Sequence, residues 1–178
     1  MTNPTVHVRP GAPADASALA HLAVLTFRTT YEPFNTAANI DQYVGAAFAV
    51  DQVRSDLNAD NLITLLASVD DELVGYGQLR LHVVTPLWVP GRHPVELHRF
   101  YVDAAWHGRH VAAHLLEHCV SAAAATGSTS LWLGVWQQNA RAIRFYRKHG
   151  FHAVGRQEFM LGDDRQDDWL MAKPLAGE

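Results

Sequence analysis

The segment 95–151 constrains the fold of this chain more than any other, because its hydrophobic period alternates between that of a strand and that of a helix. Apolar and aromatic runs at 95–102 and 131–136 predict strands, and apolar residues at helical spacing predict helices at 108–126 and 140–149. A strand, a long helix and a second strand in this order form a βαβ-like crossover. Such a crossover favours a mixed sheet covered by helices.

Helical and strand-like segments on either side complete the predicted order. Before the crossover we expect a short strand, helical segments and a β-hairpin, at 6–9, 14–29, 39–48, 51–57, 62–69 and 73–84. After it, strands at 151–160 and 169–173 flank an acidic turn. The chain is therefore expected to be one domain, 1–178, of mixed α/β (α+β) class. It should have a mostly antiparallel sheet of about seven strands and about four helices, in the order β-αα-βββ-α-β-α-ββ.

The turn that enters the long helix, at 103–112, is suited to bind phosphate. A tight turn before a helix exposes backbone N–H groups at the positive end of the helix dipole. Three small residues permit close approach of a ligand and three basic ones add positive charge: Gly108, Ala112, Ala113, His107, Arg109 and His110. The alternative is an ordinary strand-to-helix connection that binds nothing.

The short helix 140–149 has recognisable ends and carries one aromatic residue of interest. Asn139 is a favoured N-cap, and Gly150 occupies the position after the helix where a left-handed backbone is common. Tyr146 lies three residues after Ile143, so it is either a core aromatic or a functional phenol.

Charge and cysteine content narrow the function classes. The net charge is −4 and the pI about 6.2, which disfavours nucleic acid as the main partner. Cys119 is the single cysteine, so no internal disulfide forms and a reducing cytoplasm is expected. No signal peptide or apolar run of membrane-spanning length is recognised, so no membrane association is expected.

The histidines His110, His114 and His118 recur every four residues on one helix face. Such a face could hold a metal, but a solvated helix face is the favoured interpretation, and no Asp or Cys pattern supports zinc. We therefore expect no metal.

The crossover segment resembles the core of the GNAT superfamily of N-acetyltransferases. The likeness is carried by Glu96-Leu97-His98-Arg99-Phe100-Tyr101-Val102, by His107-Gly108-Arg109-His110-Val111-Ala112, and by Asn139-Ala140, Tyr146 and Gly150-Phe151. The turn departs from the family pattern Arg/Gln-x-x-Gly-x-Gly/Ala at His107 and at His110.

Within the superfamily, the chain is most similar to the PaiA-like polyamine acetyltransferases. The similarity lies in Glu-Leu-x-Arg before Tyr101, in Leu-Gly-Val-Trp at 133–136 and in the acidic stretch 161–168. Ribosomal-protein N-terminal acetyltransferases usually carry Glu where this chain has Gly134, which counts against that branch.

The resemblance implies a sheet that bulges in strand 95–102 and splays between this strand and strand 131–136, with acetyl-CoA bound in the opening. It assigns the cosubstrate to Phe100, Tyr101, Val102, His107, Gly108, Arg109, His110, Val111, Ala112, Ala113 and Asn139. It assigns to Tyr146 the protonation of the leaving thiolate. Because Cys119 lies on an apolar helix face, direct attack by a primary amine in a ternary complex is preferred over a covalent enzyme intermediate.

The general base is left open. Glu96 is one candidate, and its alternative role is an ion pair at a strand end, for example with Arg99. His98, two residues on, shares the face of Glu96 in a regular strand and is the other candidate. The acceptor is expected between 31–48 and the loop 85–94, on Tyr31, Glu32, Trp88 and His98.

The expected acceptor is a polyamine or another small amine. Two alternatives remain: a protein N-terminal or lysine acetyltransferase, which needs a groove that the loop 85–94 does not block, and a CoA-binding sensor without the chemistry. A homodimer is common in the family that the chain resembles.

Overall fold

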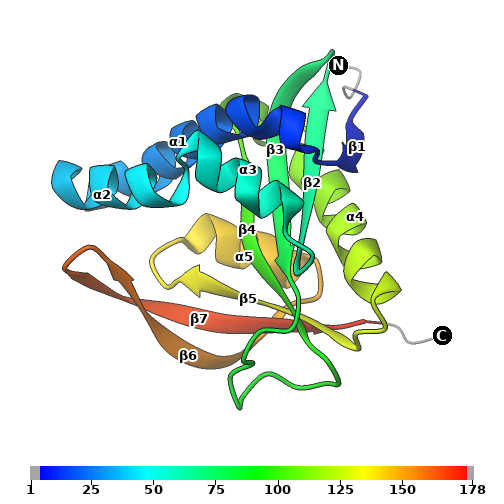
Figure 1. Cartoon of the computed structure of the whole chain (residues 1–178). Helices are drawn as coiled ribbons and strands as arrows, with labels where there is room; N and C mark the ends of the chain where they lie inside the picture. Colours follow the sequence, from blue (N-terminus) through cyan, green and yellow to red (C-terminus); the bar gives the residue numbers. More distant parts are fainter. Residues whose placement is uncertain (1–4, 176–178) are drawn as a thin grey trace.

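The structure, a computed structural model, describes residues 5–175, which form a seven-stranded mixed sheet with helices on both faces (Figure 1). The strands are β1 His7–Pro10, β2 Leu62–Val69, β3 Glu72–Arg80, β4 Val95–Val102, β5 Ser130–Trp136, β6 His152–Leu161 and β7 Asp164–Pro174. The α-helices are α1 Ala16–Tyr31, α2 Ala37–Ala47, α3 Val50–Asn58, α4 Val111–Ala125 and α5 Ala140–Lys148. The sheet order is β1-β2-β3-β4-β5-β7-β6, with only β4 and β5 parallel in this part of the chain. The predicted class and the predicted order of strands along the chain are confirmed, and residues 5–175 contain five α-helices where about four were expected.

The pairing of β4 with β5 is short. It consists of two residue pairs, Val95–Leu131 and Glu96–Trp132, after which the strands diverge. β5 stays paired with β7 along its whole length, and β4 stays paired with β3. Figure 1 shows β5, β7 and β6 turning away from β2, β3 and β4. The predicted splay is confirmed, and it leaves one edge of β4 facing an opening in the sheet.

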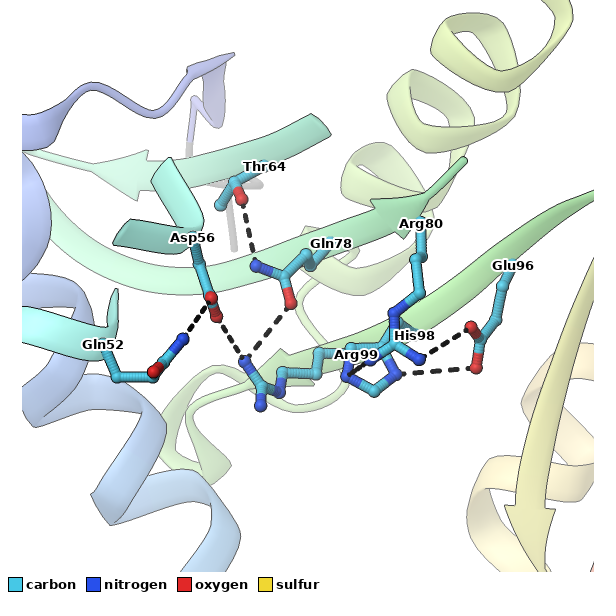
Figure 2. Close-up of polar contacts among 8 residues, drawn as sticks. All are labelled: Gln52, Asp56, Thr64, Gln78, Arg80, Glu96, His98 and Arg99. Carbon is cyan, nitrogen blue, oxygen red and sulfur yellow. Dashed lines mark hydrogen bonds and ion pairs between the residues drawn. The ribbon is translucent and has the colours of Figure 1, made fainter. Parts of the chain in front are cut away.

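A β-bulge in β4 decides which side chains face which layer. Leu79 of β3 pairs with Leu97 and Gln78 with Arg99, so His98 is the extra residue. In a regular strand, His98 and Arg99 would point to opposite faces. Here both line one polar region between β3, β4 and the helices α2 and α3 (Figure 2). The predicted bulge is therefore also present.

The two faces of the sheet carry separate apolar cores. Under α4 and α5 the core includes Leu97, Leu115, Leu133, Ile143 and Tyr146. Under α1, α2 and α3 it includes Leu22, Phe27, Ile40, Leu66 and Tyr76. The amphipathic helices predicted from apolar spacing supply the helical half of each core.

The boundaries of two elements differ from those predicted. β3 ends at Arg80 rather than at 84, because the chain leaves the sheet at His82, whose φ is 57°. The long helix begins at Val111 rather than at 108, because Gly108 and His110 have φ values of 76° and 64° and cannot belong to a right-handed helix.

The acidic stretch near the C-terminus is a strand and not a turn, which corrects the prediction. β7 begins at Asp164, and the turn itself is formed by Gly162 and Asp163. Asp167 is exposed and Asp168 is buried, since alternate residues of a strand point to opposite faces. The carboxylates of this stretch therefore have different environments.

Candidate active site

A cavity of about 820 Å³ occupies the opening between β4 and β5. It is lined by α1, β4, the turn before α4, the end of β5, and α5. We call it the central cavity. Of the residues predicted from the sequence to form the site, it brings together Tyr31, His98, Phe100, Tyr101, Val102, His107, Gly108, His110, Ala112, Ala113, Asn139 and Tyr146.

Two residues predicted for the cosubstrate do not line the central cavity. Val111 is fully buried in the core under α4, so only its backbone is available. Arg109 is exposed and lies over the ring of Trp106, with its guanidinium carbon 5.2 Å from the ring centroid. Trp106 itself lines the cavity.

Two residues predicted for the acceptor also lie elsewhere. Glu32 is on the surface, where it pairs with Arg28 of α1 at 3.2 Å. Trp88 is 64% exposed and covers β6, since a Cβ on Gly155 would lie 2.8 Å from its ring. The loop 81–94 therefore lies against β6 and not beside α1, which is a tertiary arrangement that no local pattern predicts.

The turn at 107–110 is fixed to β4. A carbonyl oxygen only accepts, so the contact of 2.9 Å between His107 Nε2 and the Val102 oxygen places a hydrogen on Nε2. Arg141 of α5 then donates to Nδ1 of the same ring. Burial lowers the pKa of His107, and the charge of Arg141 lowers it further. The neutral ring thus holds the turn, β4 and α5 together.

The start of α4 presents backbone donors to the central cavity. The N–H of His114 donates to the His110 oxygen at 3.0 Å, which is the first bond of the helix. The N–H groups of the three preceding residues, 111–113, come before any carbonyl that the helix could offer them. Arg141, which also lines the cavity, adds a full positive charge there. This residue was missed in the sequence, although a basic residue in the first turn of the helix that follows an N-cap asparagine was a usable signal.

Tyr146 points from α5 into the central cavity. Its ring packs between Phe100 and Phe151, at centroid distances of 6.2 and 5.5 Å. Within residues 5–175 no hydrogen bond engages its hydroxyl, and burial raises the pKa of that phenol, with a smaller contribution from Tyr31. A phenol that stays protonated and has no partner is able to donate its proton to a ligand.

Helix α5 is capped as predicted, and the caps fix the position of Tyr146. The Asn139 side-chain oxygen accepts from the N–H of Ala142 at 3.1 Å. Gly150 has a φ of 87°, and the N–H of Phe151 returns to the Tyr146 oxygen at 3.0 Å. The cap role of Asn139 is therefore confirmed.

Glu96 and His98 share a face, as predicted, but both are engaged by charged neighbours (Figure 2). One Glu96 oxygen lies 3.5 Å from His98 Nδ1, and the other lies 3.3 Å from Arg80. His98 Nε2 lies 2.5 Å from a guanidinium nitrogen of Arg80, which can only donate. Burial lowers the pKa of His98. Glu96 does not line the central cavity, and it pairs with Arg80 and not with Arg99.

Arg99 belongs to a second polar group on the same side of the sheet. Its Nη1 donates to Asp56 of α3 and to Gln78 of β3, both at 3.2 Å (Figure 2). A smaller cavity of about 340 Å³ lies beside these residues, and His98 lines both cavities. The bulge thus joins β4 to α3 through charge-assisted hydrogen bonds.

Tyr31 of α1 and Tyr101 of β4 both line the central cavity. Burial raises the pKa of Tyr31 to about 12, while its hydrogen bond with Tyr101 lowers it. The Tyr31 ring lies 6.0 Å from that of Trp136, and Phe34 lies 5.1 Å from the same indole. Three aromatic rings therefore enclose the cavity above β5.

Two further features concern metals and membranes. Within residues 5–175 no group of three or more His, Cys, Asp and Glu side chains is placed to hold a metal ion. Over the same range, no helix combines the length and apolar character needed to cross a bilayer.

Comparison with known proteins identifies relatives over most of the chain. A family model described as the acetyltransferase (GNAT) family matches residues 22–151. An uncharacterized N-acetyltransferase of Mycobacterium bovis is 33% identical over 162 residues, which is 90% of this chain and 98% of the relative.

Solved structures share the fold at lower identity. The PaiA N-acetyltransferase of Thermoplasma acidophilum, solved with coenzyme A, has a TM-score of 0.78 and 19% identity, covering 96% of this chain and 99% of that one. The ribosomal-protein-alanine N-acetyltransferase of Brucella melitensis has a TM-score of 0.68 and 22% identity, covering 95% and 99%.

Proposed function

This chain belongs to the GNAT family of acetyltransferases, and from that membership we propose that it moves an acetyl group from acetyl-CoA to the primary amine of a small molecule. One observation carries the proposal. The Tyr146 phenol faces the same cavity as the unpaired edge of β4 and the start of α4.

The residues of the central cavity fit acetyl-CoA, which would supply the acetyl group as a thioester. The N–H groups of 111–113 and the guanidinium of Arg141 suit its diphosphate. The free edge of β4 at Phe100–Val102 suits the amide groups of its pantetheine arm, since an extended chain can add to an open strand edge. The PaiA N-acetyltransferase, which is similar in fold, was solved in complex with coenzyme A.

The chain's own groups would supply the chemistry. Backbone N–H groups of β4 beside the opening would polarise the thioester carbonyl. Tyr146 would give its proton to the departing thiolate, since its pKa is held high by burial. Cys119 is an unsuitable nucleophile because it is fully buried, and burial raises the pKa of its thiol to about 12. Direct attack by the amine follows.

The acceptor would enter beside Tyr31, Phe34 and Trp136. Aromatic rings of this kind favour a cationic or partly apolar amine. We keep a polyamine as the leading candidate. The prediction that Glu96 or His98 accepts the proton stays open, although one Glu96 oxygen faces the Arg80 guanidinium and the other faces His98 Nδ1.

The test is a titration of the purified protein with acetyl-CoA, followed by thiol release against spermidine, spermine, other small amines and peptides with a free N-terminus or lysine. Binding with thiol release for a small amine supports the proposal. Release for peptides only makes the protein a protein acetyltransferase. Failure to bind acetyl-CoA refutes the proposal.

A further inference from the structure

Asp168 of β7 is a buried carboxylate without a partner. It lies opposite Trp136 of β5 and opposite Gln157 of β6, in the interior of the sheet, and is 9% exposed. Within residues 5–175 no ion pair or side-chain hydrogen bond engages it, whereas Asp163 and Asp164 accept from Asn39 and Asn35. A buried carboxylate without compensation is costly, so its presence calls for a ligand.

The carboxylate fills space that opens because residue 134 is a glycine. A Cβ placed on Gly134 would lie 3.3 Å from Asp168 Oδ2 and 2.7 Å from Gln157 Nε2. Gly134 lines the central cavity. A larger side chain at 134 would therefore separate Asp168 from the cavity, and glycine leaves the carboxylate beside it.

This position is at the narrow end of the opening. β4 and β5 pair in parallel at Glu96–Trp132, so two residues further on Gly134 stands across the opening from His98. The turn 107–110 and the start of α4 lie beyond the other end of β4. A ligand whose phosphates rest on α4 would thus have its reactive end near Gly134.

Tyr31 connects Asp168 with the proposed proton donor. The charge of Asp168 contributes to the raised pKa of Tyr31, after burial, and Tyr31 contributes in turn to that of Tyr146. Tyr31 also packs against Trp136, the cross-strand neighbour of Asp168, with 6.0 Å between the two ring centroids. At the narrow end of the opening, Asp168 lies on the face of the sheet that α1 covers, and Tyr146 lies on the face that α4 and α5 cover.

We propose that Asp168 binds the ammonium group of the acceptor and takes its proton before the nitrogen attacks. The inference rests on the proposed function and gives a specific role to one carboxylate of the acidic stretch 161–168. It assigns the acceptor to cationic amines, because a neutral acceptor would leave the carboxylate uncompensated.

The protons of the proposed acetyl transfer balance. The acceptor ammonium gives one proton to the Asp168 carboxylate, which later releases it to solvent. The nitrogen forms a bond to the acetyl carbon as the carbon–sulfur bond breaks. The thiolate takes a proton from Tyr146, and the phenol is restored by the second proton from the new amide nitrogen.

The groups around Asp168 favour this role. Burial raises the pKa of Asp168 to about 6, and Asp167 adds to the rise. The carboxylate is thus ionised at pH 7 and more basic than a free aspartate. The groups that face it are Tyr31 from α1, Trp136 from β5 and Gln157 from β6, and none of these carries a positive charge at neutral pH.

The decisive measurement needs no knowledge of the acceptor. We would titrate S-(2-aminoethyl)-CoA and its neutral counterpart S-propyl-CoA into the wild type, Asp168→Asn and Asp167→Asn by calorimetry at pH 7.5. The first analogue holds an ammonium group two carbons from the sulfur. Asp167 is exposed on the opposite face, so its variant removes the same charge one residue away.

We expect the wild type and Asp167→Asn to bind the amino analogue at least ~10-fold more tightly than the propyl analogue. Asp168→Asn should lose this preference and still bind S-propyl-CoA as the wild type does, which shows that it is folded. In the wild type the preference should shrink at pH 5, where Asp168 is protonated.

Equal affinity of the wild type for the two analogues, or a preference kept by Asp168→Asn, would overturn the inference. Failure of every analogue to bind would instead refute the proposed function and this inference with it.

Turnover gives a second readout with the amine that releases thiol fastest. Asp168→Asn should lower kcat by ~10²-fold or more at pH 7. Its kcat should recover as the pH approaches the pKa of the amine, where the amine is neutral without help from a base. If Glu96→Gln showed this loss of kcat and its recovery at high pH while Asp168→Asn kept the wild-type kcat, Glu96 and not Asp168 would be the proton acceptor.

Discussion

Two buried acids lie at or beside the central cavity, on opposite faces of the sheet: the Tyr146 phenol lines it, and the Asp168 carboxylate lies beside Gly134, which lines it. Neither has a protein partner within residues 5–175, and burial raises the pKa of both Tyr146 and Asp168. Groups that are held in an environment unfavourable to their charge and face a cavity are the ones able to exchange protons with a ligand.

At Tyr146 the prediction concerns turnover alone. Tyr146→Phe should keep the affinity for acetyl-CoA and lower kcat by ~10²-fold, because only the transferable proton is removed. The matched control is Tyr76→Phe, since the Tyr76 hydroxyl is also buried and unpartnered but lies away from the cavity. Steady-state kinetics and calorimetry measure both; an unchanged kcat for Tyr146→Phe would remove the phenol from the mechanism.

At Asp168 the prediction concerns stability against pH. The folded pKa of about 6 lies above the unfolded value near 3.8, so the folded state holds the proton more tightly. The charged carboxylate therefore costs stability above pH 6, and this cost disappears as the pH falls toward 4. Asp168→Asn should be more stable than the wild type at pH 7.5, by on the order of 1–2 kcal/mol.

Thermal denaturation between pH 5 and pH 8 tests this expectation. The advantage of Asp168→Asn should narrow toward pH 5. A variant that is less stable than the wild type at pH 7.5 would show that Asp168 has a stabilising partner.

At the scale of single elements, hydrogen bonds at the ends of α5 and at the tip of the β6–β7 hairpin hold these elements in place. Asn139 caps the helix that holds Tyr146. Asn39 of α2 donates to Asp163 at 2.7 Å and to Asn35 at 3.0 Å, which fixes the hairpin to the helices. Figure 1 shows the tip of this hairpin below α2.

The cap of α5 can be separated from any ligand contact. Asn139→Ala should lower the free energy of unfolding by about 1 kcal/mol, and Asn139→Asp should restore it because aspartate caps equally well. If the side chain also contacts the phosphates, Asn139→Asp should bind acetyl-CoA more weakly by charge repulsion. Equal stability of Asn139→Ala and the wild type in urea would contradict the cap.

The attachment of the hairpin should be visible in stability and not in ligand affinity. Asn39→Ala should lower the free energy of unfolding by about 1–3 kcal/mol, because it removes the part-buried hydrogen bond from Asn39 to Asp163. Acetyl-CoA affinity should not change, since Asn39 does not line the central cavity. Asn58→Ala, which loses one surface hydrogen bond, is the control and should change stability by less than about 0.5 kcal/mol.

At the scale of the whole molecule, two halves of one sheet meet at a narrow junction. β1–β4 with α1–α4 form one half and β5, β7 and β6 with α5 form the other, and the direct pairing between them is the two residue pairs of β4 and β5. A ligand in the opening would contact both halves and stabilise their arrangement.

This arrangement predicts a marked effect of the ligand on stability. At 100 times its Kd, acetyl-CoA should add about 2.7 kcal/mol to the free energy of unfolding. For a chain of this length, that corresponds to a rise in Tm of about 5–10 °C. A thermal shift series with acetyl-CoA, and with ATP as a phosphate control, measures it; a flat response to acetyl-CoA would contradict binding in the opening.

The sequence by itself determined the elements and the motif that identifies the family. Hydrophobic period predicted β2 and β4 to the residue, and Asn139 and Gly150 predicted the ends of α5, because caps and periods are local properties of the chain. The resemblance to the GNAT superfamily assigned Tyr146 and the turn before α4 to one site.

Only the tertiary structure decided which charged groups pair with one another and which lie beside the central cavity. Arg80 of β3 forms an ion pair with Glu96, the loop with Trp88 lies over β6, and Asp168 belongs to a stretch predicted as an acidic turn. Each of these depends on strand register and on packing between distant segments. The burial of Asp168 beside Gly134 depends on how β5 and β7 pair. Gly134 leaves space without a side chain, and the strand register places the Asp168 carboxylate in that space.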